Sequence, residues 1–198
     1  MNEALSLFGL TTTPFELTAF LLSMATVYLN IRQNHWAWLF SIVASGAYGV
    51  VFFDARLYGD MGLQGVFIAV SVWGWYQWLR GGEAHQGLGV SVLDARGWGL
   101  SLAGWLGGYL VLAWFLRAYT NTDVPHMDAF LTAGSLVGQV LLSRKKVENW
   151  LTWIVVDVLY VGLYVYKNLM LTAILYAVFV MMAVAGWRAW SGSVGKTA

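Results

Sequence analysis

A stripe of polar and aromatic side chains in one hydrophobic segment has the chemistry to bind a small molecule. The segment runs from Lys145 to Lys167. As a helix it is roughly 30 Å long, which is enough to cross the hydrocarbon core of a bilayer. Its polar and aromatic residues recur every three or four positions and share one helix face: Asn149, Trp150, Trp153, Asp157, Tyr160 and Tyr164. This pattern predicts that the face forms the wall of a binding site.

Asp157 lies in the middle of this segment. A carboxylate near the centre of a bilayer costs at least ~2.5 kcal/mol, so it needs a partner or a water-filled cavity. Asp157 could therefore contact a solute, or it could accept a hydrogen bond from a neighbouring helix. Asn149 has two interpretations for a different reason, because it lies near a helix end and could cap that helix instead of binding a solute.

The composition indicates that most of the chain is surrounded by lipid. Of 198 residues, 59% are hydrophobic and 11% are charged, against about 25% charged in an ordinary globular protein. The chain has no cysteine, which excludes disulfides and thiolate metal sites, and its net charge of +1 indicates no nucleic-acid partner. We expect an all-α integral membrane protein with seven transmembrane helices, at about 14–31, 36–53, 61–79, 98–116, 127–143, 149–166 and 169–190.

The basic residues predict how the chain is oriented in the membrane. Eight Lys and Arg residues fall on the side that carries the C-terminus, and three fall on the opposite side, namely Arg56, Arg117 and Lys167. Because basic loops stay in the cytoplasm, we expect a multi-pass protein with its N-terminus outside and its C-terminus in the cytoplasm.

The chain contains an internal repeat that appears when it is shifted by 112 residues, with no gap over some fifty positions. The aligned pairs include Trp38 with Trp150, Tyr48 with Tyr160, Phe67 with Phe179, Gly74 with Gly186, Trp75 with Trp187, and Trp78 with Trp190. Four helices separate equivalent points, so the two repeats must be parallel. We predict a first three-helix repeat at 1–80, a connector at 81–122 and a second three-helix repeat with the C-terminal tail at 123–198, arranged as three plus one plus three helices. The connector begins with an exposed linker at 80–97.

The two repeats differ where a binding site would need them to differ. Ser41 and Ser45 stand opposite Trp153 and Asp157 in the alignment, so one wall would be small and hydroxylated and the other bulky and acidic. Gln64 lies one turn inside its predicted helix and is expected to face the same site. The candidate substrate-binding residues are Trp38, Ser45, Gln64, Asn149, Trp150, Trp153, Asp157 and Tyr160.

Other paired residues have simpler explanations. The tryptophans Trp75, Trp78, Trp187 and Trp190 are typical of the aromatic belt at a membrane surface. Glu16 and Asp128, which are also related by the repeat, could form an outer vestibule that attracts cations, or they could only be solvated at the interface.

The sequence argues against an enzyme. His35, His85 and His126 fall in loops on two faces, no metal-binding motif accompanies them, and no phosphate-binding loop is present. We expect no metal and no cofactor. The alternatives to a transporter are a non-transporting scaffold and an intramembrane enzyme. A scaffold would not explain why only one repeat acquired Trp153 and Asp157.

Three short motifs resemble the PnuC family of bacterial nicotinamide riboside transporters. They are the run Glu148-Asn149-Trp150-Leu151 with Trp153 after a basic loop, the run Leu57-Tyr58-Gly59-Asp60 with Leu63 and Gln64, and the cluster Gly74-Trp75-Tyr76 with Trp78. The resemblance implies a homotrimer in the bacterial inner membrane, a fold related to the SWEET sugar carriers, and facilitated diffusion driven by a cytoplasmic kinase that phosphorylates the imported solute. Because relatives in that family carry thiamine or riboflavin, those vitamins are the alternative substrates.

Nicotinamide riboside suits the chemistry of the stripe. Its cationic pyridinium ring would be attracted to an indole face by roughly 0.5 to 2 kcal/mol, and its ribose hydroxyls need donors and acceptors. We assign Trp150 and Trp153 to the ring, and Asn149, Asp157 and Gln64 to amide or hydroxyl contacts. A single acid in the middle of the membrane indicates no proton relay, so we expect a passive carrier.

Overall fold

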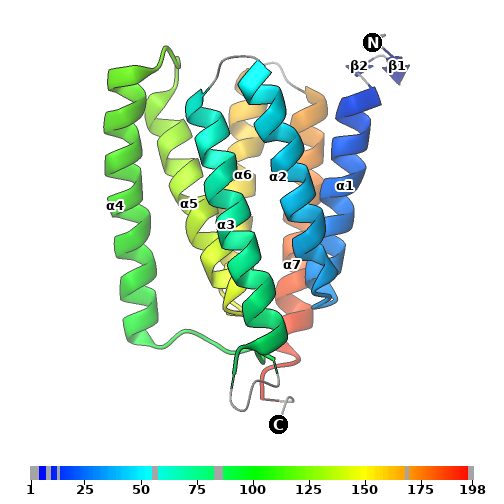
Figure 1. Cartoon of the computed structure of the whole chain (residues 1–198), viewed down its shortest axis with the longest axis vertical. Helices are drawn as coiled ribbons and strands as arrows, with labels where there is room; N and C mark the ends of the chain where they lie inside the picture. Colours follow the sequence, from blue (N-terminus) through cyan, green and yellow to red (C-terminus); the bar gives the residue numbers. More distant parts are fainter. Residues whose placement is uncertain are drawn as a thin grey trace.

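The computed structural model describes residues 5–7, 10–12, 14–54, 58–82, 87–167 and 170–195, and these form a helical bundle with a short β-hairpin before it (Figure 1). The helices are α1 Pro14–Ile31, α2 Trp36–Asp54, α3 Tyr58–Arg80, α4 Ala95–Tyr119, α5 Pro125–Ser143, α6 Asn149–Tyr166 and α7 Met170–Ser191. Strands β1 Leu5–Leu7 and β2 Leu10–Thr12 pair antiparallel. The sequence did not predict this hairpin.

All seven predicted segments are helices in the structure, and the boundaries differ most at α4. This helix begins at Ala95 because Asp94 caps it, with a carboxylate oxygen that accepts a hydrogen bond from the Gly97 backbone N–H at 2.7 Å. The remaining starts and ends lie within three residues of the prediction. Arg56, Leu57, His85 and Lys196 lie outside the described residues, as do the side chains of Glu16, Tyr48, Phe52, Tyr58 and Asp60.

Six of the helices form a closed ring. Around it, α1 packs on α2, α2 on α3, α3 on α5, α5 on α6, α6 on α7, and α7 returns to α1. Helix α4 packs on α5 from outside this ring (Figure 1). Successive helices run in opposite directions, so α1, α3, α5 and α7 all end at the lower end in Figure 1.

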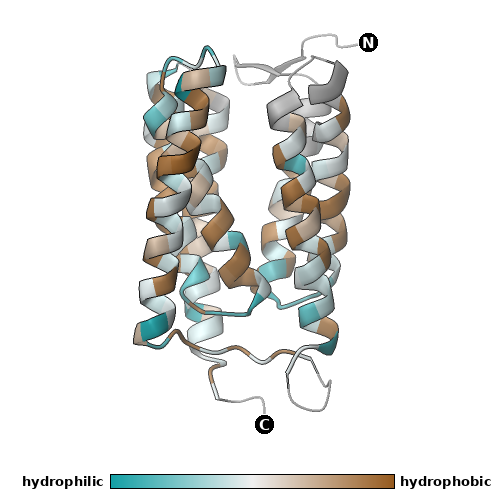
Figure 2. Ribbon diagram, turned by 60° about the vertical axis from the view of Figure 1, so that its left-hand side comes forward, coloured by the Kyte–Doolittle hydropathy of each residue, from teal (hydrophilic) through white to brown (hydrophobic). Residues whose placement is uncertain are grey.

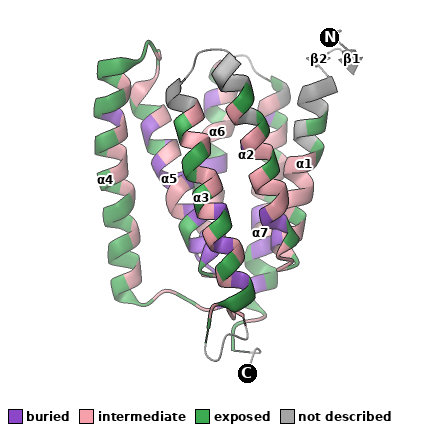
Figure 3. Ribbon diagram, in the orientation of Figure 1, coloured by how far each residue is buried: buried purple, intermediate pink, exposed green. Residues whose placement is uncertain are grey.

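The helices are mostly white to brown along their length, and most of the strongly hydrophilic residues lie near the two ends of the bundle (Figure 2). Helix α4 is exposed along nearly its whole length and buries Ala113 alone (Figure 3). Its large exposed side chains include Leu100, Leu106, Val111 and Trp114. Of the described helices, α4, α6 and residues 172–191 of α7 are each long and apolar enough to span a membrane.

Two turns at the lower end have the same geometry at positions 112 residues apart. Gln33 between α1 and α2 and Lys145 between α5 and α6 both have left-handed backbones, with φ of 54° and 48°. Asn34 N–H donates to the Leu29 carbonyl, and Lys146 N–H donates to the Leu141 carbonyl, each at 2.9 Å. The sequence repeat therefore extends to backbone conformation at these turns.

The linker before α4 is not the freely exposed segment that its glycines and charges suggested. Ser91 forms a β-bridge with Lys146, and Val90 is buried in the core. Glu148 Oε1 accepts a hydrogen bond from the Leu93 N–H at 2.9 Å. The stretch 87–94 is thus fastened to the turn between α5 and α6.

Close packing between α4 and α5 depends on Gly134. A Cβ at this position would overlap the Trp105 ring and would lie 2.8 Å from Val156 Cγ2. Trp105 cannot easily move, because its Nε1–H donates to the Phe130 carbonyl at 2.9 Å.

We expect Gly134→Ala to lower stability in detergent by about 1 to 3 kcal/mol through overpacking. Gly107→Ala on α4 is the matched control, since a Cβ added at Gly107 would have nothing within 4 Å, and it should leave stability unchanged or slightly raised. Thermal unfolding of the two variants measures this difference, and equal melting temperatures would contradict the packing described.

Candidate functional site

A cavity of about 370 Å³ lies inside the ring and is lined by residues from all six ring helices. Helices α1, α2 and α3 contribute a wall of hydroxyl and amide side chains: Ser23, Thr26, Asn30, Ser41, Ser45 and Gln64. Helices α6 and α7 contribute an aromatic and acidic wall: Trp150, Trp153, Asp157, Tyr176 and Phe179. An apolar pocket with a few convergent polar groups is the usual form of a small-molecule site.

A second cavity, of about 400 Å³, lies outside the ring between α4 and α5. Its lining is aliphatic and glycine-rich apart from Ser101, Arg144 and Lys146. The ring cavity is the better candidate for a polar solute because it combines aromatic faces, an acid and several amides.

Five of the eight predicted substrate-binding residues line the ring cavity, namely Ser45, Gln64, Trp150, Trp153 and Asp157. The structure thus brings together residues from α2, α3 and α6 that the sequence had linked through the repeat and the motifs. Asp157 is buried, with 5% exposure, and no hydrogen bond or ion pair of its carboxylate is found within the described ranges. The interhelical hydrogen bond considered for Asp157 is thus absent from the described part of the chain.

The other three predicted residues do not line the cavity. Trp38 is 1% exposed and packs over Gly74, where an added Cβ would lie 2.5 Å from the indole. Asn149 is fully buried, and its Nδ2 donates to the Lys146 carbonyl at 2.6 Å, so it caps the turn before α6. Tyr160 stacks on Tyr164 with ring centroids 5.6 Å apart. Direct contact between these three side chains and a solute in the cavity is therefore not expected.

Sequence reasoning missed the contribution of α1 and of Gln139. Ser23, Thr26 and Asn30 follow one another at intervals of three and four positions, which is the same helical spacing that revealed the stripe on α6. Gln139 belongs to a polar chain across three helices. Its Nε2 donates to Ser71 Oγ at 3.4 Å, and Ser71 Oγ lies 3.1 Å from Ser41 Oγ.

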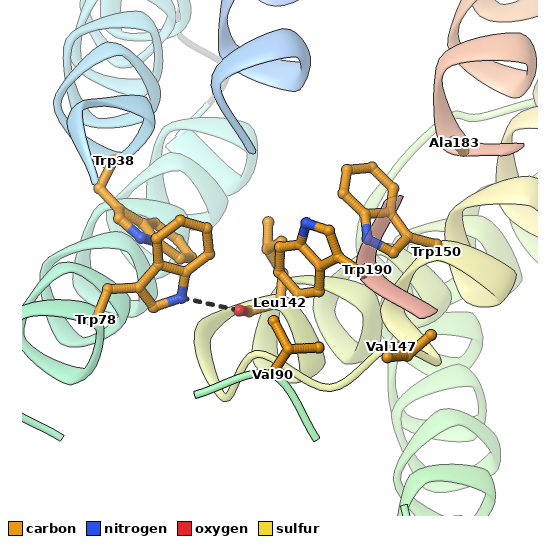
Figure 4. Packing of buried hydrophobic residues seen from close by; sticks show 8 residues of the cluster. All are labelled: Trp38, Trp78, Val90, Leu142, Val147, Trp150, Ala183 and Trp190. Atoms are coloured by element: carbon orange, nitrogen blue, oxygen red, sulfur yellow. Dashed lines mark hydrogen bonds between the residues drawn. The ribbon is translucent and has the colours of Figure 1, made fainter. Parts of the chain in front are cut away.

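Four buried tryptophans pack together near the lower end of the bundle, and we call them the indole floor: Trp38, Trp78, Trp150 and Trp190 (Figure 4). Trp150 also lines the cavity. Trp38 meets Trp78 edge to face at 5.4 Å, and Trp150 meets Trp190 in the same way at 5.4 Å. Trp78 and Trp190 then meet at 5.9 Å and join the two pairs. The aromatic-belt interpretation was therefore wrong for Trp78 and Trp190, which are 5% and 0% exposed.

Hydrogen bonds from the indole floor cross between helices that are distant in sequence. Trp78 on α3 donates from Nε1 to the Leu142 carbonyl on α5 at 3.1 Å (Figure 4). Trp190 on α7 donates from Nε1 to the Asn30 and Ile31 carbonyls on α1, each at 3.2 Å. Leu142 and Asn30 are themselves 112 positions apart, so the two bonds are equivalent under the repeat.

The charged groups of the described loops lie at the ends of the bundle. At the lower end the Lys145 ammonium sits 4.8 Å from the Trp78 ring centre, and burial lowers the pKa of Lys145. At the upper end Lys167 Nζ donates to Asp123 Oδ1 at 3.0 Å, and this bond lowers the pKa of Asp123. Asp128 accepts a hydrogen bond from Thr122 Oγ1 at 2.6 Å, so it holds the local loop together.

A model of one protein family matches residues 13–192, and the description of that family is nicotinamide mononucleotide transporter. The chain belongs to this family. Its relatives and its structural neighbour are transporters and not enzymes. The chain is therefore a helical membrane protein of a bacterial family of vitamin transporters.

The relatives of this protein transport different vitamins. The riboflavin/roseoflavin transporter RibM of Streptomyces davaonensis is 29% identical, over 96% of this chain and 90% of its own length. The nicotinamide riboside transporter PnuC of Escherichia coli is 25% identical, over 79% of this chain and 76% of its own length. The crystal structure of the vitamin B3 transporter PnuC matches with a TM-score of 0.70 and 25% identity, over 91% of this chain and 81% of that one.

We expect Trp190→Phe to destabilise the family member by about 1 to 3 kcal/mol, because the carbonyls of residues 30 and 31 lose a buried donor. Trp187→Phe is the matched control, since Trp187 is 41% exposed and lies on the same helix. Thermal unfolding in one detergent compares the two, and a Trp187 variant as unstable as the Trp190 variant would count against the crossed hydrogen bonds.

Proposed function

We propose that the protein is a passive carrier that imports nicotinamide riboside into bacteria across the inner membrane. The observation that carries the proposal is the cavity inside the ring, in which Trp150, Trp153 and Asp157 stand on one wall and hydroxyl and amide side chains on the other. A cationic aromatic ring suits the first wall, and a ribose suits the second. The membership of the chain in a vitamin transporter family supports the same conclusion.

The proposed roles follow from this placement. Trp150 and Trp153 stack on the pyridinium ring, Asp157 balances its charge or accepts from a ribose hydroxyl, and Gln64 and Ser45 bind hydroxyl or amide groups. Trp38, Asn149 and Tyr160, which do not line the cavity, act at most by holding these side chains in place.

The proposed architecture is two parallel three-helix repeats joined by α4, as in SWEET-like carriers. The order of neighbours in the ring supports it, because the junction of α1 with α7 becomes the junction of α5 with α3 when the chain is shifted by one repeat. The matching turns at Gln33 and Lys145 also support it. Residues 1–80 and 123–198 are the repeats, and 81–122 is the connector.

Transport is proposed to alternate between an open and a closed lower end. The indole floor adjoins the cavity through Trp150, and in this proposal release toward the lower end requires Trp78 and Trp190 to leave the carbonyls of α5 and α1. Asp157 is the single carboxylate among the described lining residues, and the lining includes no Lys, Arg or His. That composition favours facilitated diffusion over proton coupling, with trapping of the solute by a cytoplasmic kinase. We further propose a homotrimer with its N-terminus outside and its C-terminus in the cytoplasm.

Riboflavin is the second candidate substrate, and the observation that favours it is the 29% identity with RibM over nearly the whole of both chains. Its flat ring system would also stack on tryptophans, and its ribityl hydroxyls would also meet the polar wall. It differs from nicotinamide riboside in being uncharged, so Asp157 would have no cation to balance.

Purified protein in liposomes tests the function directly. We expect nicotinamide riboside to enter down its own gradient with no proton or sodium gradient, and excess unlabelled nicotinamide riboside to compete more strongly than riboflavin or thiamine. Uptake that needs an ion gradient would contradict the passive mechanism, and stronger competition by riboflavin would transfer the assignment to that vitamin.

We expect Asp157→Asn to weaken binding of nicotinamide riboside by tenfold to a hundredfold, because it removes a charged contact of about 1.5 to 3 kcal/mol. The variant should remain folded, since a neutral amide is easier to keep within a membrane than an acid. Asp123→Asn is the control, because Asp123 pairs with Lys167 in an outer loop. Calorimetry on both variants, after gel filtration shows them intact, measures the effect; an intact Asp157 variant with unchanged affinity would remove this residue from the site.

A further inference from the structure

Asn30 on α1 presents a buried polar group without a partner at the ring cavity. Its side chain is 7% exposed and lines the cavity, and its Oδ1 is sealed from solvent. Within the described ranges this oxygen accepts no hydrogen bond. A buried acceptor left unpaired costs about 1 to 3 kcal/mol, so such groups in native proteins need an explanation.

The position of Asn30 places this oxygen beside the indole floor. The backbone carbonyl of Asn30 accepts the Nε1–H of Trp190 at 3.2 Å, and Trp190 meets Trp150 at 5.4 Å. Trp150 also lines the cavity. The unpaired amide oxygen therefore lies near the lower end of the cavity, on the side where the tryptophans would hold an aromatic ring.

The equivalent position in the internal repeat shows that a polar side chain is not needed to present a backbone carbonyl to the indole floor. Leu142 occupies the equivalent place on α5, it also lines the cavity, and its carbonyl accepts the Nε1–H of Trp78. An aliphatic side chain is thus sufficient to present a carbonyl to the indole floor. The carboxamide of Asn30 is an additional feature of one repeat, as Trp153 and Asp157 are of the other.

We propose that Asn30 recognises a carboxamide or imide group on the solute once its side chain turns the sealed oxygen toward the cavity, an inference that rests on the proposed transport function. A carboxamide carries one acceptor and one NH₂ donor, so it pairs with the complementary donor and acceptor of another amide. A carboxylate offers acceptors alone, and it leaves the Asn30 oxygen unpaired while facing the acid of Asp157 in the same cavity. The protein therefore selects nicotinamide riboside over nicotinic acid riboside, which has the same ring and sugar.

A site built to hydrogen-bond a substrate group discriminates strongly against the analogue that lacks it, because its own polar group is then left unpaired. Asn30→Leu introduces the residue type found at the equivalent position 142. It removes the hydrogen bonds to the solute carboxamide and leaves an aliphatic side chain in their place. The affinity for nicotinamide riboside should fall at least tenfold and the affinity for nicotinic acid riboside much less. The affinity ratio, defined as the affinity for nicotinamide riboside divided by that for nicotinic acid riboside, should therefore fall.

The experiment is calorimetry with both ribosides on the wild-type protein, Asn30→Leu and Trp75→Phe. Trp75 is the matched control, because its Nε1 is also buried without a partner in the described part of the chain, yet it does not line the cavity. We expect the affinity ratio to be unchanged in Trp75→Phe. The ratio is taken within one preparation, so it does not depend on the fraction of active protein.

An affinity ratio that is unchanged in Asn30→Leu would overturn the proposal, whether both affinities stay the same or both fall by the same factor. If that variant does not fold, Asn30→Asp is the second variant, since it keeps the shape of the side chain, removes the NH₂ donor and adds a negative charge. The charge should repel nicotinic acid riboside, so the affinity ratio should rise. An unchanged ratio in Asn30→Asp would also overturn the proposal.

Wild-type protein that binds neither riboside would refute nicotinamide riboside as the substrate and leave the role of Asn30 open to the same test with riboflavin. The comparison is then riboflavin, whose ring carries an imide, against its N3-methyl derivative, whose imide donor is blocked. Wild type should prefer riboflavin and Asn30→Leu should not, and equal preference in both proteins would overturn the proposal.

Discussion

Indole hydrogen bonds from two tryptophans hold the ring together at its lower end. Each joins helices that are not consecutive in the chain, since Trp78 ties α3 to α5 and Trp190 ties α7 to α1. In lipid no hydrophobic driving force holds helices together, so packing and buried hydrogen bonds must do so. The cavity, its two contrasting walls and the placement of Trp150 all depend on these two junctions.

The glycines opposite the indole floor show how sequence makes this geometry possible. An added Cβ at Gly74 would lie 2.5 Å from the Trp38 ring, and at Gly186 it would lie 2.6 Å from the Trp150 ring. Gly74 of α3 therefore leaves room for the Trp38 ring of α2, and Gly186 of α7 leaves room for the Trp150 ring of α6. Trp78 and Trp190 reach from α3 and α7 to α5 and α1. These two packing roles, a glycine beside a tryptophan ring and a tryptophan that donates to a distant helix, explain why Gly74 recurs as Gly186 and Trp78 as Trp190.

Sequence patterns predicted the helices well because hydrophobic length and turn residues are local properties. They also predicted the acidic and aromatic wall, since the spacing on α6 has one dominant periodicity. They failed for Trp78 and Trp190 because an indole at a membrane surface and an indole buried between helices have the same composition. They missed Asn30 and Gln139 because the sequence around a single amide in an apolar helix does not show which side chains of other helices surround it. The burial of Val90 beneath the bundle depended on a long-range pairing with Lys146 that no local pattern encodes.

The position of α4 outside the ring has a consequence for how such chains diversify. Its one buried residue is Ala113, and it contributes no residue to the ring cavity. Apart from the contacts of Trp105 with α5, its main requirements are enough length and apolarity to carry the chain from one face of the membrane to the other. Mutational drift on its outer face is therefore uncoupled from solute selectivity, so a lineage can acquire new neighbours in the membrane through α4 while it continues to carry the same cargo.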